Sequence, residues 1–215
     1  LNLFDQALSI NDNYAEAHLN KGNLLQKEGK SKEALISFNR ALSIKPNYAE
    51  ALNNMGAVLQ SQGKLEDSIL AYSKALRIKP NYWEAYFNIG RARNEQGYLS
   101  KAIKAYTKAI SLKHDCAEAH RDLSFIKKFT EHDPQIQLLE KLIASPITPE
   151  YEKCQYLYSL GKAYEDLGRF ESAFNQYYLG GKLRKKQLSY NIKDDELLFN
   201  KIKKQSFNIY KLKPI

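Results

Sequence analysis

A polar side chain recurs along the chain at a fixed interval of 34 residues: Asn20, Asn54 and Asn88, followed by Asp122. Asparagine is a poor helix former, so its repetition inside predicted helices suggests a use. A carboxamide can donate to a peptide carbonyl and accept from a peptide N–H. Two interpretations stay open. These side chains bind the backbone of an extended peptide, or they hydrogen-bond between helices and set the shape of the array.

Further polar side chains fall on the same helix faces as this ladder of amides. They are Asn23, Gln26, Gln60, Arg91, Asn94 and Arg121. From both groups we expect a ligand-binding set that consists of Asn20, Asn23, Asn54, Asn88, Arg91, Arg121 and Asp122.

The sequence lacks the patterns that catalysis or cofactor binding would need. It has neither a GxGxxG nor a GxxxxGK[ST] motif to cradle a phosphate. Its four histidines never pair at i, i+3 or i, i+4, which disfavours a zinc site. His18 and His120 occupy an apolar repeat position and are interpreted as packing residues. Glu16 and its repeat equivalents lie near helix starts, where they favour the macrodipole. We expect no catalytic residue, no metal and no cofactor.

Charge is concentrated at one end of the chain. The formal net charge is +9, of which residues 182–215 carry +7, so residues 1–181 carry only +2. This near-neutral body disfavours nucleic acid as a partner, and the basic tail is interpreted mainly as a solvated helix face. No apolar run is long enough to span a bilayer, so no membrane partner is expected. Cys116 and Cys154 are expected to be free thiols in the cytoplasm.

Glycines, alanines and aromatic residues share the 34-residue interval. Residues 15–48 and 49–82 are identical at 16 of 34 positions by direct comparison. Apolar spacing predicts a helix over 49–62 that Gly63 ends, and a second helix over 65–78 that Pro80 follows. Gly56 is expected to let these two helices approach closely. Each repeat is therefore a pair of helices, and no strand is expected.

These residues resemble the tetratricopeptide repeat (TPR). The resemblance implies an all-α fold: a right-handed superhelical solenoid of antiparallel helix pairs, whose first helices line a concave face. TPR domains that clamp chaperone C-terminal carboxylates use several cations. Here Leu19, Asn53 and Phe87 occupy a position where that clamp has one, which argues against such a clamp. The ladder is similar to the asparagine ladder in the repeat arm of O-linked N-acetylglucosamine (O-GlcNAc) transferases, where such residues grip substrate backbone.

The predicted organisation has seven parts. They are the second helix of a truncated repeat (1–14), three TPRs (15–48, 49–82 and 83–116), an irregular repeat and linker (117–149), a TPR-like repeat (150–187) and a basic C-terminal helix (188–215). Because the chain begins with Leu1 and inside a repeat, we expect it to be cut from a longer protein.

Residues 117–215 carry a second resemblance, through DPQI, LGKAYEDLG and the aromatic-basic run that follows. They are similar to the segment that joins the repeats to the catalytic domain in bacterial TPR sulfotransferases. Gly181 departs from that pattern, where Asn is expected. This resemblance implies that a catalytic domain follows Ile215.

Two functions are therefore expected of this chain. The first is a non-catalytic scaffold that binds a protein or an extended peptide in its concave groove. The alternative is the substrate-recruiting arm of a sulfotransferase. Exposed repeat ends could also allow self-association.

Overall fold

The computed structural model describes residues 2–188 of the 215-residue chain, with side chains from Phe4 onward. This range contains α-helices and no β-strand, so the predicted all-α fold class is confirmed. The predicted basic helix over 188–215 lies outside the described residues, apart from Leu188. The helices are α1 (Asn2–Ile10), α2 (Ala15–Lys27), α3 (Ser31–Ile44), α4 (Ala49–Ser61), α5 (Leu65–Ile78), α6 (Trp83–Glu95), α7 (Leu99–Leu112), α8 (Ala117–Ile126), α9 (Pro134–Ala144), α10 (Glu150–Asp166) and α11 (Phe170–Gln187).

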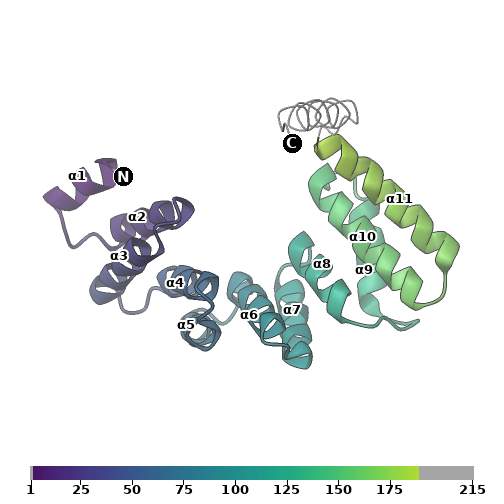
Figure 1. The fold of residues 1–215 in the computed structure, drawn as a ribbon, viewed down its shortest axis with the longest axis horizontal. Coiled ribbons are helices and arrows are strands. Elements are labelled where there is room, and N and C mark those ends of the chain that lie inside the picture. The colour runs from purple at the N-terminus through teal and green to yellow at the C-terminus, as the bar shows by residue number, and fades with distance from the viewer. Residues whose placement is uncertain (1, 189–215) are drawn as a thin grey trace, which may run out of the picture.

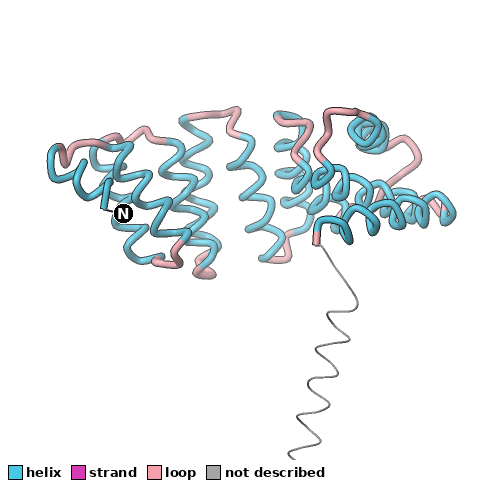
Figure 2. Tube along the Cα trace, turned by 90° about the horizontal axis from the view of Figure 1, so that it is seen from above, coloured by secondary structure: helices cyan, strands magenta, loops and turns pink. Residues whose placement is uncertain are grey.

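The helices pack in pairs that stack side by side into an open arc (Figure 1). The most extensive contacts join α2 to α3, α4 to α5, α6 to α7 and α10 to α11. Figure 2 shows neighbouring helices running alternately up and down the stack. Adjacent first helices also touch directly, α2 with α4 and α4 with α6. We call the side of the arc formed by α2, α4, α6 and α8 the inner surface.

Each regular pair is held by one glycine that faces one aromatic ring. A Cβ added to Gly56 would lie 2.6 Å from Cε1 of Tyr72, whose side chain is fully buried. The same arrangement recurs between Gly22 and Phe38, with a corresponding separation of 2.5 Å. Such separations are well inside van der Waals contact. The expectation that Gly56 permits a close helix approach is confirmed, and the ring fills the space that a side chain would need.

A second set of glycines ends the first helix of each pair. Gly63 adopts φ 74°, in the left-handed region where residues with a Cβ are strained, and so ends α4 as predicted. The next residue, Lys64, donates its N–H to Leu59 O at 3.0 Å, which satisfies a free carbonyl at the helix end. The predicted helix over 49–62 ends one residue earlier, at Ser61, and the predicted helix over 65–78 is α5.

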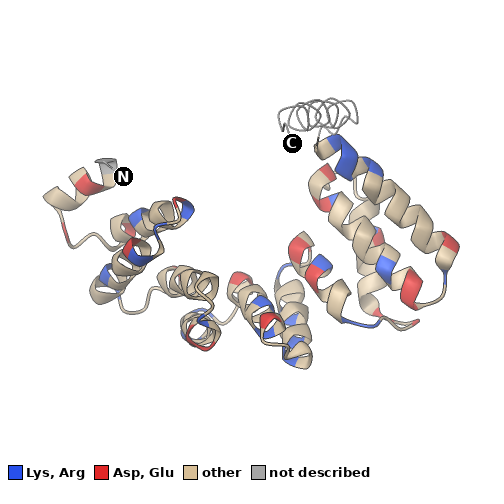
Figure 3. Ribbon diagram, in the orientation of Figure 1, with Lys and Arg blue, Asp and Glu red and all other residues tan. Residues whose placement is uncertain are grey.

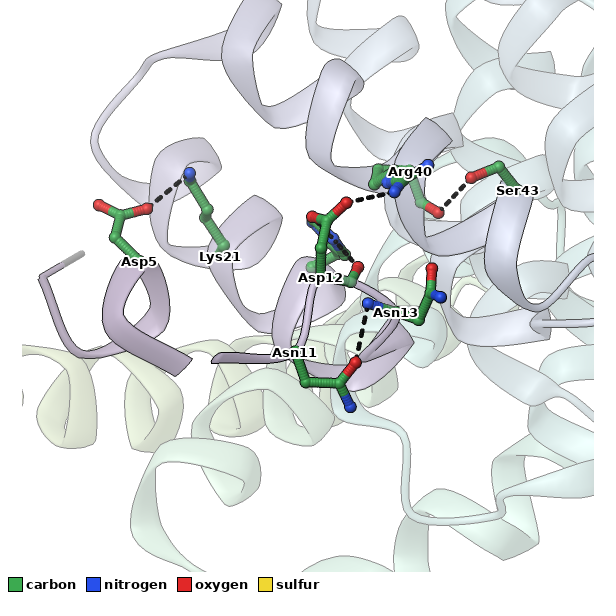
Figure 4. A network of polar contacts seen from close by, with 8 residues as sticks. Asp5, Asn11, Asp12, Asn13, Lys21, Arg40 and Ser43 are labelled. Atoms are coloured by element: carbon green, nitrogen blue, oxygen red, sulfur yellow. Dashed lines mark hydrogen bonds and ion pairs between the residues drawn. The ribbon is translucent and has the colours of Figure 1, made fainter. Parts of the chain in front are cut away.

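The first helix is tied to the array by polar contacts (Figure 4). Lys21 in α2 donates to the Asp5 carboxylate in α1 at 2.7 Å. In the following loop, Asp12 pairs with Arg40 of α3, and its carbonyl oxygen lies 3.0 Å from Nε2 of His18. His18 is buried, in agreement with its expected packing role.

The regular pairing breaks at α8. Ser124 stands where the earlier first helices have glycine, and its side chain is buried and donates to His120 O at 2.7 Å. A Cβ at this position leaves no room for an aromatic ring from the next helix. Accordingly α9 packs against α10, and α8 packs against α7 and α10. The start of α9 follows the prediction, because Asp133 caps it by accepting from the N–H of Gln135 at 3.0 Å and Pro134 is its first residue.

Candidate functional site

Two members of the predicted ladder, Asn54 and Asn88, belong to a chain of amide side chains that crosses three helices of the inner surface. Asn54 in α4 donates to Asn23 Oδ1 in α2 at 2.7 Å. The neighbouring Asn53 donates to Asn54 Oδ1 at 3.3 Å. Asn53 in turn accepts from Asn88 Nδ2 in α6 at 3.0 Å. The amides therefore link α2, α4 and α6 through a residue, Asn53, that was not in the predicted binding set.

This chain of amides leaves part of the ladder open to a ligand. Asn53 is buried, with 6% of its surface exposed, so its amide serves the scaffold. Asn54 and Asn88 are only half-buried, and Asn20 is exposed. Within the described residues neither Oδ1 of Asn88 nor the amide of Asn20 makes a hydrogen bond. The geometry thus supports the scaffold role for Asn23, Asn54 and Asn53, and it leaves Asn20 and the Asn88 oxygen able to contact a peptide.

Three of the predicted site residues meet in one open pocket beyond the end of the amide chain. Arg91 from α6 and Arg121 and Asp122 from α8 line it. Its volume is about 430 Å³, and Phe87, Asn94, Glu95, Tyr106, Glu118 and Phe125 complete the lining. The wall combines aromatic rings with charges of both signs. Such a wall can hold an extended chain through apolar contacts and hydrogen bonds at once.

The charged groups of this pocket are partly paired with one another. Arg121 donates to Asp122 Oδ1 through Nε at 2.9 Å and Nη2 at 2.7 Å. The Arg91 guanidinium lies 6.0 Å from the centre of the Phe87 ring. Burial raises the pKa of Tyr106 well above its usual range, so its phenol stays neutral. Figure 3 shows opposite charges side by side on α8, whereas α4 carries few. The pocket is thus polar without a dominant sign of charge.

Pocket size alone does not select this site. A depression of about 480 Å³ lies among α3, α4 and α5, and its lining includes Leu42, Pro46 and Arg77. None of the predicted site residues belongs to it. We therefore choose the pocket between α6 and α8, because independently predicted residues converge there.

The cysteines and the buried His120 of the described residues are held in uncharged forms by burial. No group of three or more His, Cys, Asp or Glu within them is placed to hold a metal ion. Cys116 and Cys154 are free and buried. Burial raises the pKa of the Cys116 thiol to about 11, which suppresses the reactive thiolate. Burial also lowers the pKa of His120 to about 4, so its imidazole is neutral and packs edge-on to Tyr156.

Phe125, which is 72% exposed at the edge of the pocket, is not among the predicted site residues. A signal for it existed, because Phe125 follows Arg121 by four residues and so shares its helix face. In the sequence, Asn53 stands out only because it occupies a position where the carboxylate clamp has a cation. Its role in the amide chain depends on which helices are neighbours, which residue spacing alone does not reveal.

Sequence models of the TPR family match most of the chain. Models described as TPR repeat match residues 22–63 and 59–97, and models described as tetratricopeptide repeat match residues 3–36, 84–116 and 155–179. Together they span more than half of the 215 residues. The chain belongs to the tetratricopeptide-repeat family, in agreement with the predicted resemblance. A search of curated proteins found no significant match.

Solved structures with the same fold include several TPR proteins. MamA is 26% identical, with a TM-score of 0.61 over 79% of this chain and 97% of that chain. The first TPR domain of Spaghetti (RPAP3), solved with the HSP90 peptide SRMEEVD, is 25% identical, with a TM-score of 0.51 over 52% of this chain and 89% of that chain. YrrB, described as a TPR protein with an unusual peptide-binding site, is 19% identical, with a TM-score of 0.59 over 84% of this chain and 91% of that chain, and shows the fold alone.

No described helix is long and apolar enough to cross a membrane.

Proposed function

We propose that this chain is a scaffold that binds an extended peptide on its inner surface, and that the pocket between α6 and α8 is the centre of the site. The observation that carries the proposal is that several predicted site residues converge on one pocket. Arg91, Arg121 and Asp122, singled out by their repeat positions, line one pocket with the exposed ring of Phe125. An exposed aromatic side chain beside guanidinium groups is typical of protein-binding surfaces.

The amide chain supports the same proposal in a different way. Because Asn23, Asn54, Asn53 and Asn88 hold α2, α4 and α6 together, the inner surface is a preorganised support rather than a set of mobile side chains. A rigid surface loses less conformational entropy when it binds. Asn88 precedes Arg91 by three residues in α6 and is half-buried. Its side-chain oxygen can therefore accept a hydrogen bond from a backbone N–H of a peptide that enters the pocket.

A related domain supplies further support. The RPAP3 domain, which is 25% identical and shares the fold, binds the peptide SRMEEVD. A peptide ligand is therefore within the capability of this architecture. For the present chain, we expect the ligand to lie across α4, α6 and α8.

The test is selection from a library of random 12-residue peptides, followed by calorimetric titration of the tightest binder. Arg91→Gln and Phe125→Ser should each weaken binding of that peptide, by about 1–2 kcal/mol, because they remove a guanidinium and an aromatic contact from the pocket. Lys108→Gln on α7 removes the same charge as Arg91→Gln, and Ile36→Ser on α3 removes an exposed apolar side chain. Both should leave the affinity unchanged.

Two results would contradict the proposal. Failure of the folded protein to select any peptide would remove the binding function. Equal losses in the pocket variants and the α3 and α7 controls would place the site elsewhere. Circular dichroism of each variant establishes that the fold is retained before affinities are compared.

A second candidate function is the substrate-recruiting arm of a sulfotransferase. The observation that favours it is the resemblance over residues 117–215, which includes the Asp133-Pro134 pair that opens α9. Under this proposal the peptide on the inner surface is the acceptor. The test is the coding sequence downstream of Ile215: a strand followed by a loop that binds the phosphosulfate donor is expected, and a stop codon there would contradict it.

We also propose a cytoplasmic location and a capacity for self-association through the ends of the array. The free state of both buried cysteines favours the first. Ile10 of α1, 87% exposed, favours the second. Light scattering should show a concentration-dependent dimer that Ile10→Ser weakens, and a monomer at all concentrations would overturn this part.

A further inference from the structure

A second pocket lies farther along the chain, where α8, α10 and α11 meet. Its volume is about 390 Å³. The lining residues are Arg121, Tyr151, Cys154, Gln155, Tyr158, Arg184 and Gln187. Arg121 also lines the pocket between α6 and α8, so the two pockets are adjacent. An extended chain that occupies the first pocket can continue into the second.

The lining of this second pocket contains two guanidinium groups and no carboxylate. Among the described residues, Arg184 has no carboxylate within ion-pair distance, whereas its neighbour Lys186 pairs with Glu150 at 2.7 Å. The nearby Glu118 accepts from the phenol of Tyr151 at 3.2 Å. Arg121 is bonded to Asp122 through Nε and Nη2, which leaves other N–H groups of its guanidinium unused. The lining of the pocket therefore presents guanidinium and amide donors and no carboxylate of its own.

Gln155 supplies an independent sign of an unfilled site. Only 7% of its surface is exposed, and it lines the pocket. Within the described part of the chain, Gln155 Oε1 is buried and has no hydrogen-bond partner. Leaving a buried polar atom unpaired costs about 1–3 kcal/mol, so such atoms call for an explanation. The terminal torsion of a Gln side chain is soft, which allows its amide to turn and present both N–H and oxygen to a peptide bond.

We propose that this pocket binds an acidic residue of the bound peptide. Its carboxylate pairs with Arg184 and the unused N–H groups of Arg121, and its backbone pairs with the amide of Gln155. Guanidinium groups bind carboxylates through paired hydrogen bonds, and a buried side-chain amide can likewise form two hydrogen bonds with a peptide group. The carboxylate can come from an Asp or Glu side chain or from a peptide C-terminus. This inference rests on the proposed peptide-binding function and specifies the chemistry of its ligand.

The experiment extends the selection from the random 12-residue library. We expect the selected peptides to be enriched in Asp and Glu. The tightest binder is then synthesised in three forms: unchanged, with each acidic residue changed to its amide, and with an amidated C-terminus. Loss of affinity in the second form assigns the carboxylate to a side chain, and loss in the third assigns it to the terminus.

Arg184→Gln is the decisive variant, and Lys185→Gln is its matched control. Both residues are exposed on the last turn of α11 and carry the same charge, but Lys185 does not line the pocket. Arg184→Gln should weaken binding of the acidic peptide about tenfold. It should leave the affinity for the peptide form that lacks the carboxylate unchanged. Lys185→Gln should change either affinity by less than about twofold. Gln155→Leu should weaken binding of both the acidic peptide and the form without the carboxylate, since it removes the contact to the peptide backbone.

The outcomes separate this inference from the function on which it rests. If no peptide is selected, both the peptide-binding function and the proposed carboxylate site are contradicted. Selected peptides without acidic character would overturn the inference and leave peptide binding intact. So would an equal effect of Arg184→Gln on the acidic and neutral peptides, or an effect no larger than that of Lys185→Gln.

Discussion

The side-chain amide of Asn88 in α6 donates a 3.0 Å hydrogen bond to the side-chain oxygen of Asn53 in α4. This bond joins two neighbouring repeats, and it uses the donor end of a ladder residue for structure. The acceptor end of Asn88 has no partner within the described residues. A single asparagine can therefore support the array through its N–H group and face a ligand through its oxygen.

This division predicts different effects for two members of the ladder. Asn88→Ala removes the bond to Asn53 and leaves a buried amide oxygen without its donor, so the free energy of unfolding should fall by about 1–2 kcal/mol. Asn20→Ala removes an exposed side chain and should change the free energy of unfolding by less than about 0.5 kcal/mol. Urea unfolding followed by circular dichroism measures both. Equal stability of the two variants would show that the amide chain contributes nothing to the scaffold.

The glycine and aromatic pairs predict a strong position dependence for alanine. Gly56→Ala places a Cβ 2.6 Å from Cε1 of the buried Tyr72, and the overlap should destabilise the protein by about 1–3 kcal/mol despite the better helix propensity of alanine.

Gly180→Ala in α11 is the matched control for this substitution. Its Cβ would approach Tyr158 no closer than 3.4 Å, an ordinary contact, so the variant should be as stable as the wild type or slightly more stable. Thermal unfolding of the two variants gives the comparison. A Gly56→Ala protein as stable as Gly180→Ala would refute the role assigned to the ring.

His120 predicts a loss of stability in mild acid. Burial lowers its pKa in the folded protein to about 4, against 6.5 for the unperturbed side chain. Between these values the unfolded chain binds a proton that the folded chain does not, so stability falls as pH falls from 6.5 to 4. The contribution is up to about 3 kcal/mol.

Besides burial, the hydrogen-bond partner of one ring nitrogen disfavours protonation of His120. Nε2 lies 2.8 Å from His114 O and Nδ1 lies 3.1 Å from Gln135 Nε2, so Nε2 donates and Nδ1 accepts. A proton on Nδ1 would face the donor of Gln135. Urea midpoints at pH 7, 5.5 and 4.5 measure the slope. The exposed His132→Gln should retain it, and His120→Gln should flatten it; an unchanged slope in His120→Gln would contradict the assignment.

The cysteines predict a protein that resists alkylation while folded. Because the pKa of Cys116 is raised to about 11, its thiolate fraction at pH 8 is about a hundredfold below that of a free thiol. Burial raises the pKa of Cys154 also. Iodoacetamide should modify neither within minutes at pH 8, and both should react at once in urea. Rapid modification of the folded protein would show that one of these side chains opens to solvent.

Much of the regular part could be predicted from the sequence because local signals agree there. Gly63 ends α4 since only glycine tolerates the left-handed turn, and Gly56 reveals the close approach of α5. Asp133 and Pro134 mark the start of α9 for equally local reasons. Such features depend on neighbours within one repeat and so can be read without knowing the tertiary structure.

The rest depends on contacts between distant residues. Ser124 signals the loss of the glycine contact, but it does not reveal that α9 packs on α10. For the same reason the sequence predicts that Arg184 belongs to a solvated basic face, although it lines a pocket with Arg121 from a helix more than 50 residues earlier in the chain. The partners of Gln155 and Asn53 follow from the same packing.

The structure of the complex with the peptide selected from the random 12-residue library tests the central claim most directly. We predict that the peptide lies along the inner surface, with a side chain against Phe125 and Arg91 in the pocket between α6 and α8. A peptide bound to the outer faces of α3, α5 and α7, or to the ends of the array, would contradict it.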